Sequence, residues 1–343
     1  MEKLMKAISM TTSNGITCQD VPKPEKAGPE HLLIKMDSCA INPGDKAYIG
    51  RTFPIGIVLS QYDIYGASGA GTVIEAGAGV PEAYNGKKVA IYRSLKASEN
   101  IIGTWCEYSH VHFLDCVVLP DEAKPDEYSG SLVNIITPYA FLKQISAEGH
   151  KGIICTAGNS ATGVAMLGIC LAYDFPIISL VRNEENKRQL EGLGAKNIVV
   201  QNNGNFKQYL GEMSQKMGTT AIFDGIGGEI LNKIMDTIPN NSVIYCYGFL
   251  GGGTPLTIHT SLLMRGITIK GFSNFRTTTV QDPQNLEKAL KDISGIIQMP
   301  HFKTRIGKKF RLEEINDALQ FVSGKGGRAV LSVGVNSGAL IVQ

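Results

Sequence analysis

The chain has no pair of cysteines in C-x-x-C spacing, although seven cysteines are scattered along its 343 residues. This excludes the usual zinc-ligand spacings and a disulfide framework. An excess of either charge is also lacking: the net charge is +2, so no broad field favours nucleic acid or an anionic membrane. The N-terminus lacks an apolar signal core, and Asp174 and Pro176 interrupt the apolar stretch 163–181. We therefore expect a cytoplasmic protein without a nucleic-acid or membrane partner.

Short strands and turns are typical of residues 1–125, where no clear long helix is evident. Apolar residues between turn residues predict strands at 6–10, 30–38, 70–76, 88–92 and 104–110. We expect an antiparallel β-domain with irregular loops over this part of the chain.

Strands and helices alternate from about residue 126 onward. Helices are predicted near residues 127–147, 164–173, 184–192, 205–217, 228–237 and 282–299. Strands are predicted near residues 152–156, 175–181, 197–200, 220–224, 242–247, 267–272, 306–310 and 328–333. Strands that are regularly separated by helices imply a parallel, doubly wound sheet. The pattern predicts two domains, one of residues 1–125 completed by 273–343 and one of residues 126–272.

Residues 151–182 form the order strand, small-residue loop, helix and second strand, which is how dinucleotide folds hold a pyrophosphate. The loop departs from the usual G-x-G-x-x-G spelling, because Ala157, Ser160 and Gly163 stand at its three key places. A loop of this kind also occurs in α/β proteins that bind no nucleotide. In this context we expect it to bind phosphates at a helix N-terminus. The candidate residues are Asn159, Ser160, Ala161, Thr162 and Gly163.

The second strand of this unit ends on a cation, Arg182. A site that prefers NAD usually has an acidic residue there to bond both ribose hydroxyls. A guanidinium instead suits a 2′-phosphate through charge-assisted hydrogen bonds, with Lys187 or Arg188 one turn further on. We therefore predict NADPH over NADH. The alternative is that Arg182 is simply an exposed residue at a helix start.

Several short segments together resemble one known family in their order and spacing. They are residues 40–45, 66–71, 86–89, 103–108, 134–139, 157–163, 192–195, 224–228 and 326–328. On these segments the chain resembles the medium-chain dehydrogenase/reductase superfamily, and within it the zinc-free quinone reductases and the mitochondrial-type enoyl thioester reductases. The resemblance implies an α/β fold, with a GroES-like β-domain and a Rossmann domain inserted before its C-terminal part.

Zinc alcohol dehydrogenases of this superfamily carry metal ligands that the chain lacks. The resemblance places Asn42 where they have a cysteine, Ala67 and Ser68 where they have His-Glu, and Val133 near a later cysteine. None of these side chains offers a thiolate or an imidazole, so we expect no metal. Without a Lewis acid to activate an alcohol, the hydride acceptor should already be electrophilic. A quinone, an enone or an enal fits.

The resemblance also implies a set of residues that bind the dinucleotide. Asn42 and Thr137 are expected near the nicotinamide, and the loop after Phe272 over its carboxamide. The remaining expected residues are Gly225, Tyr247, Gly248 and Arg328. Asn42 and the proline after it are also a common turn pair, which is the simpler interpretation.

A proton donor is harder to name. Enoyl thioester reductases carry a tyrosine at the position that matches Phe53, which cannot donate a proton. Quinone reductases carry a tyrosine close to Tyr48, so Tyr48 and Asn42 are the candidate catalytic residues. Tyr62 and Tyr65 are further possibilities, although any of the three tyrosines could be buried with a satisfied hydroxyl.

The leading prediction is an NADPH-dependent reductase of a quinone or an α,β-unsaturated carbonyl. The alternatives are an enoyl thioester reductase and a non-catalytic NADPH-binding protein. Family members are commonly homodimers that join Rossmann sheets edge to edge, so a homodimer is expected. The strand near residues 242–247 and the segment 253–259 are the candidate contacts.

Overall fold

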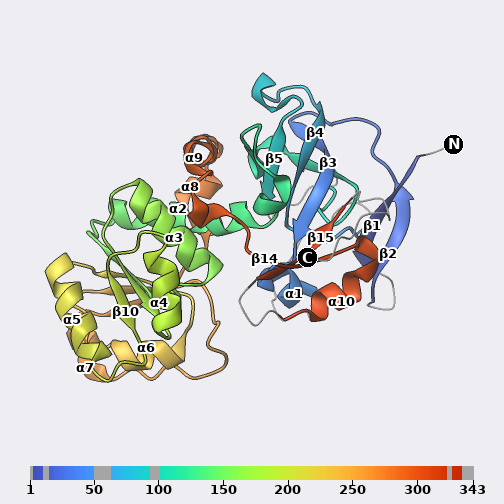
Figure 1. Cartoon of the computed structure of the whole chain (residues 1–343). Coiled ribbons are helices and arrows are strands. Elements are labelled where there is room, and N and C mark those ends of the chain that lie inside the picture. The colour runs from blue at the N-terminus through green and yellow to red at the C-terminus, as the bar shows by residue number, and fades with distance from the viewer. Residues whose placement is uncertain (1–2, 11–14, 50–62, 93–100, 323–326, 334–343) are drawn as a thin grey trace. The chain divides into compact units, whose positions relative to one another are not determined.

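The computed structural model describes residues 3–10, 15–49, 63–92, 101–322 and 327–333. The chain divides into two compact units (Figure 1). Unit 1 contains residues 1–133, 290–298 and 303–343, and unit 2 contains residues 134–289 and 299–302. No helix among the described residues has both the length and the apolar character needed to span a membrane.

Unit 1 is built on a mainly antiparallel sheet, as the short strands and turns of its sequence predict. Its strands are β1 (Leu4–Met10), β2 (Ile16–Pro22), β3 (His31–Ala40), β4 (Ser68–Ala76), β5 (Lys88–Tyr92), β6 (Tyr108–His112), β7 (Cys116–Val118), β14 (Ile306–Phe310) and β15 (Arg328–Ser332). The main sheet has the order β14-β15-β3-β4-β5-β7, with β6 paired to β3, and β1 pairs with β2 alone. Two short helices, α1 (Pro43–Ile49) and α10 (Ile315–Gln320), accompany these strands.

The chain returns to unit 1 at residues 290–298 and again from residue 303. β15 pairs antiparallel with the end of β3, with Val330 opposite Ala40. The backbone N–H of Ile41 then donates to the carbonyl of Ala329 at 3.0 Å. This pairing brings the residues just after β3 close to the first residue of β15.

One predicted strand of unit 1 was placed too early. Residues 104–107 precede β6, and their backbone is bonded to β1 instead, where Ile8 N–H donates to the Trp105 carbonyl at 2.8 Å. The Trp105 side chain is fully buried, which explains why this segment has the apolar character of a strand. β2 and β7 were not predicted.

Unit 2 contains a six-stranded parallel sheet with helices packed against it (Figure 1). The strands are β8 (Ile153–Cys155), β9 (Ile177–Val181), β10 (Ile198–Val200), β11 (Ala221–Asp224), β12 (Val243–Cys246) and β13 (Thr268–Gly271). The helices are α2 (Ser131–Ala147), α3 (Ala161–Ala172), α4 (Glu184–Glu191), α5 (Phe206–Met217), α6 (Gly228–Ile234), α7 (Thr260–Met264), α8 (Thr278–Gln281) and α9 (Pro283–Ile296), of which α2 begins and α9 ends in unit 1. The predicted doubly wound sheet is confirmed.

The strand order of this sheet is β10-β9-β8-β11-β12-β13. The chain therefore moves outward from β8 to β10, returns to β11 beside β8, and moves outward again to β13. In open α/β sheets, ligands bind outside the carboxyl ends of the strands at the point where this order reverses. That point lies between β8 and β11.

The same order corrects one expectation about assembly. β12 was predicted to offer an edge for a second copy, but it pairs with β11 on one side and β13 on the other. Its backbone hydrogen-bonding groups are consequently used inside the sheet. The edges of this sheet are β10 and β13.

Candidate functional site

The loop at residues 157–163 joins β8 to α3 at the carboxyl edge of the sheet. Ser160 is the N-cap of α3, and its hydroxyl accepts from the backbone N–H of Gly163 at 3.0 Å. A Cβ on Gly163 would lie 2.0 Å from the carbonyl oxygen of Ala157, so only glycine fits there. The loop thus makes the close strand-to-helix turn that the motif requires, despite its unusual spelling.

The side chains of this loop differ in exposure. Ala161 is exposed, whereas Asn159, Ser160 and Thr162 are half-buried. The Thr162 hydroxyl donates to the side-chain oxygen of Asn134 in α2 at 3.1 Å. The first turn of α3 therefore presents small side chains and a positive dipole end at the reversal point of the sheet, where an anion is favoured.

Arg182 follows β9 directly and is exposed. The next residue, Asn183, caps α4 by accepting from the Asn186 N–H at 3.0 Å. Arg182 therefore stands between the carboxyl end of β9 and the start of α4, as the sequence predicts. This is the place where dinucleotide folds contact the adenosine ribose.

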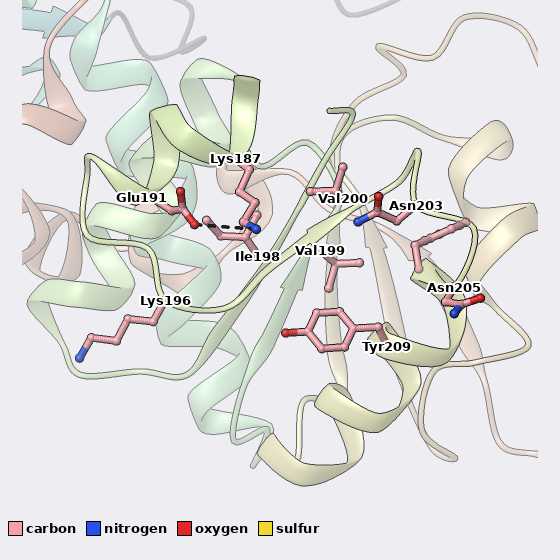
Figure 2. A pocket seen from close by; sticks show the side chains of 10 residues that line it. Lys187, Glu191, Lys196, Ile198, Val199, Val200, Asn203, Asn205 and Tyr209 are labelled. Atoms are coloured by element: carbon pink, nitrogen blue, oxygen red, sulfur yellow. Dashed lines mark ion pairs between the residues drawn. The ribbon is translucent and has the colours of Figure 1, made fainter. Parts of the chain in front are cut away.

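Lys187 has a different environment. Its ammonium lies 3.6 Å from the Glu184 carboxylate and 3.9 Å from that of Glu191. Figure 2 shows Lys187 and Glu191 at a cavity of about 480 Å³ that is lined by α4, β10 and the start of α5. Residues of β10 and Tyr209 also line the cavity, and no residue of the 157–163 loop does. The charge of Lys187 is partly neutralised by its two acidic neighbours.

Three of the residues expected to bind the dinucleotide, Gly225, Tyr247 and Gly248, lie together in unit 2. A Cβ on Gly225 would lie 2.5 Å from the Tyr247 hydroxyl, and a Cβ on Gly248 would lie 3.1 Å from the carbonyl oxygen of Gly225. The Tyr247 ring stacks on Phe223 with centroids 4.0 Å apart. Its hydroxyl is buried and has the Ser160 side chain as its hydrogen-bonding neighbour. Burial holds the pKa of Tyr247 well above its usual value, so the phenol is protonated at neutral pH.

The carboxylate of Asp224, next to Gly225, is fully buried. It accepts from the Thr156 hydroxyl at 2.6 Å, from the Ile226 N–H at 3.3 Å and from the Gly227 N–H at 3.0 Å. The Thr156 hydroxyl in turn accepts from the Gly225 N–H at 3.2 Å. Burial raises the pKa of Asp224, and these hydrogen bonds to the charged form oppose the shift.

Phe272 and Thr137 complete the predicted residues of unit 2. Phe272 is buried just after β13. Its ring packs edge to face with that of Phe141, with the ring centroids 5.2 Å apart. Its backbone N–H donates to the Cys246 carbonyl at 2.8 Å, which fixes the start of the loop that follows. Thr137 is half-buried in α2, one residue before the proline inside that helix.

In unit 1 the structure brings Asn42 and Arg328 together. Arg328 donates to the side-chain oxygen of Asn42, and the Asn42 amide nitrogen donates to the Ser68 hydroxyl at 2.6 Å. Asp45 accepts from the backbone N–H groups of Asn42 at 2.8 Å and Ala67 at 3.3 Å. Burial lowers the pKa of Arg328 to about 10, and the Asp45 carboxylate opposes that shift.

The tyrosine candidates are only partly described. Tyr48 lies in α1, but its side chain is outside the described part of the structure, as are Phe53 and Tyr62. Tyr65 is buried, with its ring centroid 6.2 Å from that of Trp105. Within the described ranges, no group of three or more His, Cys, Asp or Glu side chains is arranged to hold a metal ion.

The side-chain roles of four residues in this geometry were not predicted from the sequence, although the resemblance already included the 224–228 turn: they are Thr156, Asp224, Ser68 and Asp45. The first two had a usable signal, because each is a polar residue at the end of an apolar strand, just before a small-residue turn. Ser68 and Asp45 had none, since their contacts depend on the packing of β4 and α1 around Asn42.

Two family models match the chain. The alcohol dehydrogenase GroES-like domain matches residues 28–121, and the zinc-binding dehydrogenase model matches residues 161–294. Among curated relatives, quinone oxidoreductase-like protein 2 of Bos taurus is 23% identical over 57% of this chain and 56% of its own length. The mitochondrial enoyl-[acyl-carrier-protein] reductase of Caenorhabditis elegans is 24% identical over 74% of this chain and 72% of its own.

Solved structures share the fold over nearly the whole chain. A quinone oxidoreductase of Pseudomonas syringae has a TM-score of 0.73 at 17% identity, covering 96% of this chain and 99% of its own. The quinone oxidoreductase of Escherichia coli, in complex with NADPH, has a TM-score of 0.72 at 14% identity, again covering 96% and 99%. Identities this low establish the fold and leave the substrate open.

Proposed function

Because this chain belongs to the medium-chain dehydrogenase/reductase superfamily, we propose that it is an NADPH-dependent reductase that transfers a hydride to a quinone or an α,β-unsaturated carbonyl without zinc. The observation that carries the proposal is the combination of the 157–163 loop at the reversal point with Arg182 at the end of β9. The NADPH complex of the Escherichia coli structure supports the choice of cofactor.

The residues of unit 2 fit a dinucleotide. The N-terminus of α3 offers backbone N–H groups to a pyrophosphate, and the glycines at 225 and 248 let the ends of β11 and β12 pack closely, because a Cβ on either would crowd Tyr247 or the Gly225 backbone. Arg182 is exposed and so accessible to a 2′-phosphate. When bound, the cofactor would supply a hydride from its nicotinamide ring. The chain itself would hold the ring and exclude water.

The absence of zinc in this proposal rests on residue types. Asn42 and Ser68 hydrogen-bond to each other, and neither offers the thiolate or imidazole of a zinc site. A reductase without a Lewis acid needs an acceptor that is already electrophilic, such as a quinone, an enone or an enal. Tyr48 and Asn42 stay the proposed catalytic residues.

Turnover with purified protein tests the proposal. NADPH is mixed with a panel of quinones, enones, enals and a crotonyl thioester, and the loss of nicotinamide absorbance is followed. Reduction of a quinone or a simple enone is expected. Reduction of the thioester alone, lost on Tyr48→Phe, would favour the enoyl thioester reductase that the Caenorhabditis elegans relative suggests. Tight NADPH binding with no turnover on any acceptor would make the chain a non-catalytic NADPH-binding protein.

We also propose a homodimer that forms through unit 2. Three large apolar side chains are exposed in the segment that leads to the edge strand β13: Ile258, Leu263 and Met264, with 48%, 60% and 84% of their surface accessible. A second copy would cover them and pair with the backbone of β13. The predicted segment 253–259 therefore contributes one of the three, while β13 replaces residues 242–247 as the edge.

A further inference from the structure

Two strands of unit 2 end side by side at the reversal point of the sheet and then separate. After β8 the chain enters the 157–163 loop, and after β11 it enters the 224–228 turn. Thr156 is the first residue beyond β8, and Asp224 is the last residue of β11. The Thr156 hydroxyl donates to Asp224 Oδ1 at 2.6 Å, so a side-chain hydrogen bond joins the bases of the two turns.

The two side chains are held from both sides. Thr156 Oγ1 also accepts from the Gly225 N–H, so the hydroxyl connects the carboxylate to the backbone of the turn. Asp224 uses its other contacts to fix the Ile226 and Gly227 amides. Gly227 has a φ of 97°, in the region that favours glycine, so the shape of this turn depends on amide positions that the carboxylate controls.

Burial makes this arrangement costly to disturb. Thr156 and Asp224 both have no exposed surface. A buried carboxylate is tolerated when donors satisfy it, and here a hydroxyl, two amides and the Cys246 thiol do so. Removing one donor leaves a buried group unsatisfied, which a rearrangement of the turn would have to relieve.

We propose that Thr156 and Asp224 are positioning residues that hold the phosphate-binding loop and the 224–228 turn at the separation that a dinucleotide requires. The proposal rests on the proposed function, because it assumes that the ligand at this edge is a dinucleotide. The pair acts below the pyrophosphate and the nicotinamide half, away from Arg182. It should therefore serve NADPH and NADH equally and should have little effect on a ligand that contacts only the Arg182 side.

The test uses the full-length protein and three ligands: NADPH, NADH and adenosine 2′-monophosphate, which lacks both the pyrophosphate and the nicotinamide. The variants are Thr156→Val, which keeps the shape and removes the hydroxyl, and Asp224→Asn, which keeps the size and removes the charge. Thr156→Ser keeps the hydroxyl and should rescue binding. Dissociation constants are measured by titration calorimetry or by nicotinamide fluorescence where it applies.

Thr156→Val and Asp224→Asn are each expected to raise the dissociation constants of NADPH and NADH by the same factor, roughly tenfold. Adenosine 2′-monophosphate should bind both variants as tightly as it binds the wild type. Thr156→Ser should bind NADPH and NADH with dissociation constants within about twofold of the wild-type values. The effects of the two changes should be less than additive in the double variant, because both disturb the hydrogen bond between Thr156 and Asp224. If Asp224→Asn does not fold, Thr156→Val still decides the matter, since it leaves the carboxylate in place.

A matched control is Thr219→Val, at the opposite end of β11. Thr219 is also fully buried, and its hydroxyl donates to the Ser214 carbonyl at 3.4 Å. This change should lower stability without selective loss of the dinucleotides. The proposal is wrong if Thr156→Val binds NADPH like the wild type, or if it weakens all three ligands equally. A wild type that binds none of them would instead refute the proposed function.

Discussion

The guanidinium of Arg328 donates a hydrogen bond to the side-chain oxygen of Asn42, which lies 286 positions earlier in the chain. The amide nitrogen of the same Asn42 side chain donates to the Ser68 hydroxyl. An amide with one donor partner and one acceptor partner has a fixed orientation. The return of the C-terminal strand to unit 1 is what makes this possible, because β15 starts at Arg328 and pairs with the end of β3.

Ser68→Ala should disturb the Asn42 amide selectively. The change removes the acceptor at 2.6 Å and leaves the amide held by Arg328 alone. If Asn42 lies near the nicotinamide, KM for NADPH should rise by about three- to tenfold, in line with the loss of one hydrogen bond. Ser109→Ala is the control, because the buried Ser109 hydroxyl donates to the Ile102 carbonyl at 2.8 Å instead. Equal kinetic effects of the two changes would contradict a role for Ser68 at the amide.

Arg182→Ala should separate the two cofactors. Loss of charge-assisted hydrogen bonds to the 2′-phosphate is expected to raise KM for NADPH by about ten- to a hundredfold. KM for NADH, which lacks that phosphate, should hardly change. Steady-state kinetics with both cofactors and one acceptor gives the answer, and an equal response of both would show that Arg182 does not select the cofactor.

Lys187→Ala should raise KM for NADPH less than Arg182→Ala does. Lys187 lies between two carboxylates, and in Figure 2 it faces the cavity beside β10. Its charge is partly neutralised before any ligand binds, so we expect KM for NADPH to rise by less than about threefold. Glu184→Gln tests the reason, because removing one carboxylate should lower KM for NADPH. A larger effect for Lys187→Ala than for Arg182→Ala would reverse the assignment.

His301→Gln should flatten the pH dependence of stability. His301 is buried against Gly168 of α3, its Nε2 bonds to the Leu193 carbonyl at 2.7 Å, and its Nδ1 has no partner among the described residues. Burial lowers the pKa of His301 below its ordinary 6.5. The unfolded chain therefore takes up a proton near pH 6.5 that the folded chain refuses, and stability present above that pH is lost as the pH falls towards the folded pKa.

Urea unfolding of the wild type and of His301→Gln, between about pH 5 and 7.5, measures this difference. As the pH falls, the free energy of unfolding of the wild type should decrease by up to about 1.4 kcal/mol per pH unit more than that of the variant. If the free energies of unfolding of the two proteins change in parallel with pH, His301 is protonated as easily in the folded chain as in the unfolded chain. His150 provides a comparison, since burial lowers its pKa as well and the substitution leaves it in place.

Met264→Lys should weaken the proposed dimer. A charge at the most exposed apolar side chain of α7 would have to be buried on association. Analytical ultracentrifugation is expected to show a dimer for the wild type and a larger monomer fraction for the variant. Leu171→Lys is the control, because Leu171 is exposed on α3, away from β13. A monomeric wild type would refute the dimer itself.

Much of the fold follows from local patterns. The predicted bounds of β5 and β14 agree with the structure, and those of most strands and helices of unit 2 differ by a few residues. In unit 2 the strands β8 to β11 are buried on both faces, so apolar runs between helices are easy to recognise in the sequence. In unit 1 the failures came from tertiary pairing: Trp105 gives its segment the look of a strand, but the backbone there bonds to β1.

The candidate site was less predictable than the fold. The place of Arg182 at the end of β9 is local, so the residue pattern was sufficient for it, whereas the cap at Ser160 was not predicted because the helix was expected to begin at residue 164. The bond between Thr156 and Asp224 joins residues 68 positions apart, and that between Asn42 and Arg328 spans 286. Such contacts depend on strand order and register, which the sequence pattern does not specify residue by residue.

The most direct test of the central claim follows the hydride itself. Metal-depleted protein is incubated with an enone and with NADPH that carries deuterium at the transferred position of nicotinamide C4, and the product is examined by mass spectrometry and NMR. Our account predicts deuterium at the β-carbon of the reduced enone, with a rate that a chelator does not lower. Product without deuterium, or a reaction that stops on metal removal and returns with zinc, would contradict it.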